Sequence, residues 1–276
     1  MKRAFSAVLL LSLVSFAAAA GAQDWAKASL EKSPRHREWV KVKHDNREVQ
    51  AFVVYPERKD KAPVVLVIHE IFGMTDWVQS LADQLAAAGY IAIAPDLLSG
   101  MGPNGGGTSS MTDPQAVGKA IRDLPPDQIT ADLNAVADYA KKLPASNGKL
   151  AVTGYCWGGS QSFRYATNRP DLNAAFVFYG TAPENVSSIK APVYGFYAGN
   201  DARVNATLPA TTEAMKAAGK TFEPVTYEGA GHGFMRAGEA PEPGADATEQ
   251  QKTAYAGNKK ARAEAWDRWL KLLKAM

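Results

Sequence analysis

Cys156, the only cysteine of this 276-residue chain, lies where a nucleophile could be exposed. It stands in Gly154-Tyr155-Cys156-Trp157-Gly158-Gly159, after the apolar run 149–153 and before a stretch with helical character. This resembles G-x-S-x-G, in which a nucleophile projects from a sharp strand-to-helix turn, with sulfur replacing the hydroxyl. The start of the next helix favours a thiolate. A buried, unreactive cysteine is the alternative. We therefore expect catalysis by a thiol.

A thiol nucleophile needs a general base, and the chain offers four histidines. His36 and His44 lie in the polar N-terminal region, and His69 follows an early apolar run. His232 lies in a glycine-rich loop, 228–234, after a strand-like segment. Flexible glycines on both sides can present an imidazole at a site, so His232 is the expected base.

The acid that orients this histidine should follow a strand between nucleophile and base. Asp201 comes directly after the strand-like segment 192–197, and its carboxylate could fix the imidazole tautomer. Asp171 is the rival, but it follows the helix after the cysteine too soon and suggests a helix-end turn. The order nucleophile, acid, histidine favours Asp201.

An oxyanion hole requires two backbone donors. The first expected donor is the N–H of Trp157, directly after the nucleophile, and the second is the N–H of Ile71, after the apolar run 64–68. Glu70 is unexpected beside them, because a carboxylate opposes a nearby thiolate unless the thiol keeps its proton or the charges are held apart.

Strands and helices alternate along the chain. Residues 38–55 predict an N-terminal hairpin. Continuous apolar runs, typical of parallel strands covered on both faces, occupy 63–68, 90–94, 150–153, 174–179 and 192–197. Helices are expected at 76–88, 129–142, 160–168, 208–218 and 258–274, with loops at 99–115 and 237–248. The pattern predicts a doubly wound, mostly parallel sheet with helices on both faces. Together with the turn around Cys156, this indicates the α/β-hydrolase fold.

The N-terminus has the pattern of a secretory signal. Lys2 and Arg3 precede an apolar stretch, and Ala20-Gly21-Ala22 fits a cleavage site. The apolar core 7–16 is short for a membrane anchor. We expect a signal peptide at 1–22, a single domain at 23–276, and a periplasmic or secreted protein that is no longer membrane-bound after cleavage.

Charge gives little support for a nucleic-acid partner. The chain carries 31 Lys and Arg against 28 Asp and Glu, and removing Lys2 and Arg3 lowers the net charge from +3 to +1. A nearly neutral protein lacks the basic footprint that nucleic acid requires. The histidines are too dispersed to suggest a metal site. We expect a monomer without metal or cofactor.

From about residue 38 onwards the chain resembles the dienelactone hydrolase family. The motifs are His69-Glu70-Ile71-Phe72-Gly73, Pro95-Asp96-Leu97, the segment around Cys156, Tyr197-Ala198-Gly199-Asn200-Asp201 and Gly231-His232-Gly233-Phe234. The resemblance implies a Cys156-His232-Asp201 triad. It also implies that Glu70 holds or deprotonates the thiol according to whether substrate is bound, and that Arg236 helps to bind a substrate carboxylate. Arg236 could otherwise be a solvated charge. The family's second arginine has no match in 99–107.

The expected activity is hydrolysis of a small carboxylic ester or lactone through a thioacyl-enzyme. One alternative is a broad-specificity esterase or peptidase-like hydrolase of the same fold. Another is a binding protein or thiol sensor that has kept the fold without turnover. Hydrolysis that depends on Cys156 would separate the enzymes from the binding protein.

Overall fold

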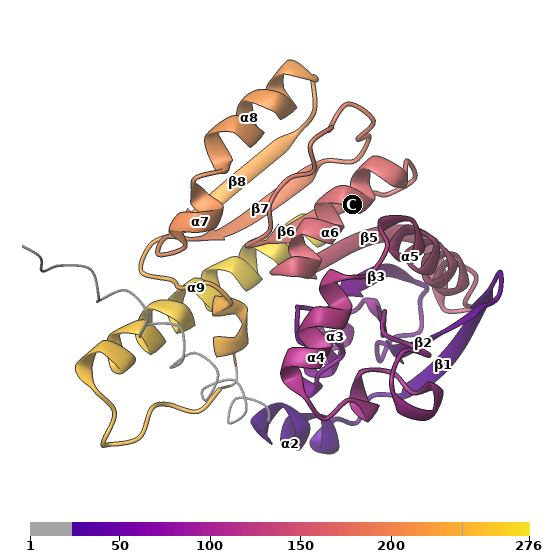
Figure 1. The fold of residues 1–276 in the computed structure, drawn as a ribbon, viewed down its shortest axis with the longest axis horizontal. Coiled ribbons are helices and arrows are strands. Elements are labelled where there is room, and N and C mark those ends of the chain that lie inside the picture. Colours follow the sequence, from indigo (N-terminus) through magenta and orange to yellow (C-terminus); the bar gives the residue numbers. More distant parts are fainter. Residues whose placement is uncertain (1–23, 239) are drawn as a thin grey trace, which may run out of the picture.

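A single sheet organises the computed structural model, which describes residues 24–238 and 240–276 (Figure 1). Within these residues the sheet has eight strands in the order β1-β2-β4-β3-β5-β6-β7-β8. Their bounds are β1 Arg37–His44, β2 Arg47–Val54, β3 Ala62–Ile68, β4 Ile91–Pro95, β5 Ser146–Tyr155, β6 Ala174–Phe178, β7 Val193–Ala198 and β8 Phe222–Tyr227. The first three in sheet order pair antiparallel and all later pairs are parallel. This confirms the predicted hairpin and the mostly parallel sheet.

Helices cover both faces of the sheet. The bounds are α2 Asp24–Lys32, α3 Asp76–Ala87, α4 Pro114–Arg122, α5 Pro126–Lys141, α6 Trp157–Asn168, α7 Ala202–Asn205, α8 Leu208–Ala217 and α9 Glu249–Lys274. Short 3-10 turns, η1 Pro103–Gly105, η2 Thr108–Ser110 and η3 Phe234–Ala237, lie in the connections. One apolar cluster unites α4, α5, α6 and α8 with one face of the sheet, and a second unites α2, α3 and α9 with the other.

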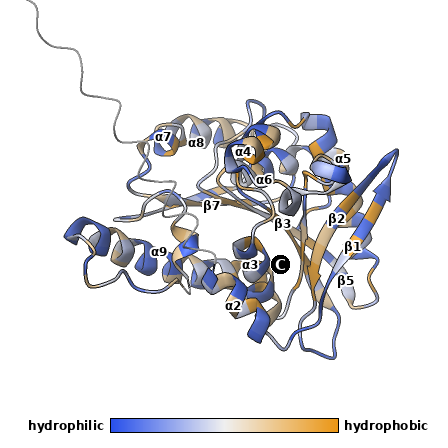
Figure 2. Ribbon diagram, turned by 60° about the horizontal axis from the view of Figure 1, so that its bottom comes forward, coloured by the Kyte–Doolittle hydropathy of each residue, from blue (hydrophilic) through white to orange (hydrophobic). Residues whose placement is uncertain are grey.

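The central strands are apolar throughout because both of their faces are covered. In β3 the side chains of Val64, Leu66 and Ile68 enter one cluster, whereas those of Val65 and Val67 enter the other. All five are fully buried, and successive strand residues point to opposite faces. Figure 2 shows these strands in hydrophobic colours between amphipathic helices. The sheet thus forms a rigid platform whose carboxyl edge is free to carry the loops.

Two helices include residues for which no helix was predicted from sequence. Helix α9 begins at Glu249 rather than 258, because Thr248 and Gln251 form a capping box. Helix α4 starts inside the expected loop 99–115, where the Asp113 side chain accepts from the Gln115 N–H and Pro114 opens the helix. Helix α2 was not predicted. The expected signal peptide, 1–22, lies outside the described residues.

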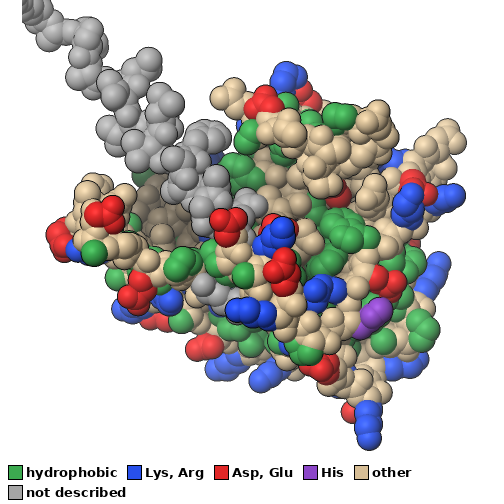
Figure 3. Space-filling view, turned by 90° about the horizontal axis from the view of Figure 1, so that it is seen from below, with side chains coloured by type: hydrophobic (Ala, Val, Ile, Leu, Met, Phe, Trp, Pro, Cys, Tyr) green, Lys and Arg blue, Asp and Glu red, His purple; other side chains and the backbone are tan. Residues whose placement is uncertain are grey.

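Acidic and basic side chains are mixed over the surface seen in Figure 3. On this face no extended region of one charge sign is seen among the described residues. Among the helices that the structure describes, none combines the length and apolar character needed to cross a membrane.

Candidate active site

Cys156 lies in a strained turn between β5 and α6. Its backbone has φ 57° and ψ −117°, a conformation that non-glycine residues rarely adopt. Its N–H donates to the Phe178 carbonyl at 3.1 Å, and its carbonyl accepts from the Ser160 N–H at 3.2 Å. The side chain is partly exposed. This geometry contradicts a merely buried cysteine and matches the strand-turn-helix predicted for a nucleophile.

Two glycines allow this turn to form. A Cβ on Gly154 would lie 1.9 Å from the Gly158 carbonyl oxygen, and a Cβ on Gly158 would lie 2.2 Å from the His69 carbonyl oxygen. Real Cβ atoms do not approach so closely. The glycines at positions −2 and +2 from Cys156 are therefore required by the close packing of β5, α6 and the end of β3.

His232 and Asp201 meet at the carboxyl edge of the sheet. His232 Nδ1 lies 2.5 Å from Asp201 Oδ2, and this carboxylate also accepts from the Val204 N–H at 3.3 Å, which caps α7. The Asp201 side chain is 7% exposed and that of His232 is 30% exposed. A buried carboxylate can thus orient a solvent-accessible imidazole. The rival Asp171 instead pairs with Lys141 and Arg169 on an exposed surface.

Glu70 and Arg236 form an ion pair beside the cysteine. Arg236 Nε lies 2.9 Å from Glu70 Oε2, and Nη2 donates to Oε1 at 3.2 Å. The Glu70 side chain is only 3% exposed. The Arg236 guanidinium also lies 5.2 Å from the centre of the Phe72 ring. Arg236 is therefore not a solvated charge, because it neutralises a buried carboxylate.

These groups set the ionisation of the thiol. Burial raises the pKa of Cys156, and the negative charge of Glu70 raises it further. The same pKa is lowered by the Trp157 N–H and by the positive charges of Arg236 and Arg203. Among the described residues, no hydrogen bond joins the thiol to His232. The resting thiol is thus kept protonated by its surroundings.

The loop after β3 carries the other expected oxyanion donor. Glu70 to Gly73 form a tight turn in which the Gly73 N–H donates to the Glu70 carbonyl at 3.1 Å. Thr108 fixes this turn from outside, because its hydroxyl accepts from the Met74 N–H at 3.2 Å and donates to Asp96 at 2.7 Å. Ile71, in the middle of the turn, is half-buried.

A cleft of about 280 Å³ lies beside this turn. It is lined by Ile71, Phe72, Pro114, Gln115, Gly118 and Arg122. Among the described residues no cluster of His, Cys, Asp and Glu side chains could hold a metal ion.

Comparison with known proteins places this arrangement in a family. The model of the dienelactone hydrolase family matches residues 49–276. The chain belongs to the dienelactone hydrolase family. A Methylorubrum extorquens protein provisionally named a carboxymethylenebutenolidase is 33% identical over 71% of this chain and 71% of its own. An Escherichia coli K12 protein with the same provisional name is 33% identical over 67% of this chain and 72% of its own.

Comparison with solved structures gives the same family. A crystal structure provisionally assigned as a dienelactone hydrolase, from Klebsiella pneumoniae, has a TM-score of 0.71 and 27% identity, covering 88% of this chain and 99% of that chain. This member of the dienelactone hydrolase family is therefore a hydrolase with the α/β-hydrolase fold, as predicted.

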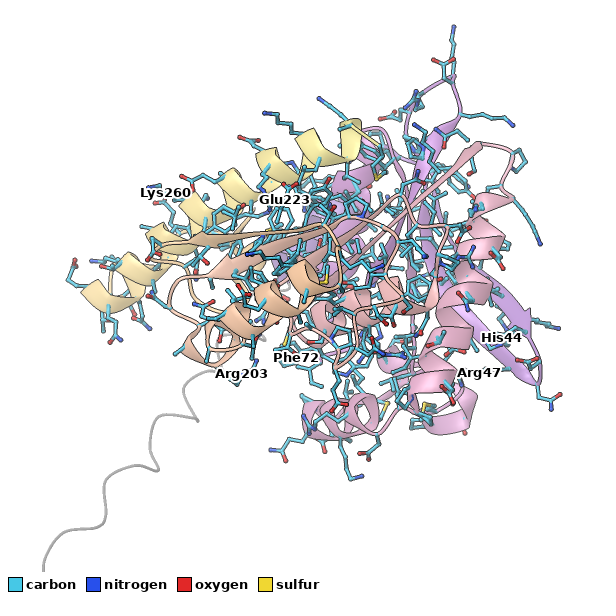
Figure 4. All side chains as sticks on the ribbon, turned by 90° about the horizontal axis from the view of Figure 1, so that it is seen from above. His44, Arg47, Phe72, Arg203, Glu223 and Lys260 are labelled. Carbon is cyan, nitrogen blue, oxygen red and sulfur yellow. The ribbon has the colours of Figure 1, made fainter. Side chains whose placement is uncertain are left out.

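Two residues near the site were not predicted as members of it. Tyr179, with φ 41°, directly follows β6, and its ring centre lies 5.0 Å from that of His232. Its hydroxyl is buried without a hydrogen-bond partner among the described residues, and burial together with Glu70 raises its pKa. Arg203 lies on the same side of the molecule as Phe72 (Figure 4). Both follow the carboxyl end of a strand, which is the signal that could have identified them.

We predict that Glu70→Gln lowers the pKa of the Cys156 thiol. The substitution removes the negative charge that raises this pKa and releases Arg236, whose positive charge lowers it. The rate of alkylation by iodoacetamide, followed against pH, should therefore have its midpoint at a lower pH than in wild type. Glu223→Gln, on an exposed part of β8, is the matched control. An unchanged or higher midpoint in Glu70→Gln would contradict this electrostatic account.

Proposed function

We propose that this protein hydrolyses a small carboxylic ester or lactone through a Cys156-His232-Asp201 triad and a thioacyl-enzyme. The observation that carries the proposal is the strained turn at Cys156, whose φ of 57° presents a thiol at the sheet edge that also holds the His232–Asp201 pair. Strained backbone of this kind costs about 1–3 kcal/mol and persists mainly at functional sites.

Each group has a distinct role. The Cys156 thiolate attacks the carbonyl carbon, the amides of Ile71 and Trp157 stabilise the developing oxyanion, and the alcohol leaves with a proton from the imidazolium of His232. His232 then removes a proton from water, which cleaves the thioester and releases the acid. Asp201 keeps the Nδ1 proton of His232 in place, so that Nε2 faces the reacting atoms.

The Glu70–Arg236 pair could couple substrate binding to the ionisation of the Cys156 thiol. While Arg236 holds Glu70, the thiol keeps its proton. A substrate carboxylate that takes over Arg236 would release Glu70, whose carboxylate could then accept the thiol proton and pass it to His232, which later gives it to the leaving alcohol. This supports small, anionic esters or lactones as the substrate class. It also limits unwanted oxidation of a free thiol in an exported protein, because thiolates oxidise most readily.

The first test is a panel of p-nitrophenyl esters, lactones and peptides, assayed with matched variants. Cys156→Ala should abolish turnover, because it removes the nucleophile. Asp201→Asn should lower kcat by about 10²- to 10⁴-fold, because the imidazole is no longer held in the productive tautomer. Asp171→Asn, which alters only the ion pairs with Lys141 and Arg169, should leave turnover unchanged.

Four outcomes would contradict the proposal. Absence of turnover on every ester and lactone, with ligand still bound, would indicate a binding protein. Turnover that persists in Cys156→Ala would exclude a thioacyl route. Turnover of neutral esters without any of lactones or anionic esters would indicate a broad esterase, and preferred cleavage of peptides would indicate a peptidase.

We also propose that residues 1–22 direct export and that cleavage leaves Gln23 as the first residue. The support is the basic, then apolar, then small-residue pattern of this segment. The intact mass of protein released from the periplasm by osmotic shock should correspond to residues 23–276. Recovery of an uncleaved chain, confined to the cytoplasm, would contradict export.

A further inference from the structure

His69 is a buried histidine that the proposed triad does not use. Its side chain is fully buried. Nδ1 lies 2.8 Å from the Glu70 carbonyl oxygen, and Nε2 accepts from the Leu97 N–H at 3.4 Å. A carbonyl can only accept and an amide N–H can only donate, so the ring must be neutral with its proton on Nδ1. Burial lowers the pKa of His69, which favours this neutral form.

The ring lies between the two segments that carry the expected oxyanion donors. His69 directly precedes the turn that contains Ile71, and its Nδ1 donates to the Glu70 carbonyl in that turn. Its other neighbour is the Trp157 indole, stacked at 5.7 Å between ring centres with an interplanar angle of 14°. The backbone of His69 also contacts Gly158, the residue after Trp157. His69 therefore contacts both donor segments at once.

The second hydrogen bond joins His69 to a fixed support. The Leu97 carbonyl accepts from Arg47 Nη2 at 2.9 Å, and Arg47 Nε lies 2.9 Å from the Asp132 carboxylate. Asp132 is 1% exposed and also contacts His44 at 2.7 Å. Figure 4 shows His44 and Arg47 side by side on the hairpin. The segment just after β4 is thus held by the ion pair of Arg47 with the buried Asp132, and His69 connects that support to the turn after β3.

From these contacts we propose that His69 is a positioning residue for the oxyanion hole. As a neutral Nδ1–H imidazole, it fixes the turn that presents the Ile71 amide and supports the indole next to the Trp157 amide. It is not an acid or base, because both ring nitrogens are occupied by backbone groups and the ring has no access to solvent. This inference rests on the proposed acyl transfer at Cys156.

The test compares His69→Phe and His69→Asn with wild type, using a p-nitrophenyl ester that wild type hydrolyses. Phenylalanine keeps an aromatic ring against Trp157 but makes neither hydrogen bond. We expect kcat to fall by about 10- to 100-fold with KM within about 2-fold, because the donors act mainly in the transition state. Asparagine, whose side-chain N–H can donate to Glu70, should recover part of the loss.

Two further measurements separate positioning from general damage. Alkylation of Cys156 by iodoacetamide needs a thiolate but no oxyanion hole, so its rate should be unchanged in His69→Phe. A trifluoromethyl ketone forms an oxyanion adduct, so its inhibition constant should rise in parallel with the fall in kcat/KM. His36→Phe, at a side chain that is 70% exposed, is the matched control and should behave as wild type.

The inference is overturned if His69→Phe keeps wild-type kcat, or if alkylation and turnover fall together. If His69→Phe does not fold, the kinetics of His69→Asn take its place. The nitrogen-15 NMR signals of wild-type His69 then report which ring nitrogen carries the proton, and a proton on Nε2 overturns the inference. Failure of the proposed function is distinguishable, because wild type itself would then not hydrolyse esters or would not need Cys156.

Discussion

The left-handed backbone of Cys156 is the constraint around which the rest of the site is arranged. Holding a non-glycine residue there costs about 1–3 kcal/mol, which the packing around it must offset. The offset comes from the Phe178 carbonyl, which fixes the Cys156 N–H at 3.1 Å, and from the buried ring of Tyr155, stacked 4.8 Å from Phe178. Because Gly154 and Gly158 let the strand and the helix approach closely, this turn can form, and the Cys156 side chain stays partly exposed at the edge of the core.

The same edge of the sheet brings distant charges together. Glu70 and Arg236 are 166 positions apart along the chain, yet they form an ion pair beside the thiol. Removing a buried carboxylate from water is costly, so the pair is stable only while both partners remain in contact. Under the proposed function, a ligand that competes for Arg236 would act directly on the Glu70 charge that raises the pKa of Cys156, and binding would thereby be coupled to activation.

Much of this arrangement could be predicted from sequence because parallel strands end at one edge. Glu70, Cys156 and Asp201 each follow an apolar run and His232 follows a strand-like segment, so chain order predicted that all four lie at this edge. The Glu70–Arg236 contact came only with the structure, since no local pattern encodes a pairing across the whole fold. Helix α4 was missed although Asp113-Pro114 is a start signal, because the glycine-rich residues before it dominated the interpretation. The roles of the site residues are still predictions.

The measurement that tests the central claim most directly is the mass of the enzyme during turnover. Wild-type protein mixed with an activated ester and quenched in acid within milliseconds should gain the mass of one acyl group, and peptide mapping should place it on Cys156 as a thioester that hydroxylamine removes. An acyl group on a serine or another residue, or steady turnover without any acylated protein even when deacylation is slowed by His232→Ala, would contradict the account.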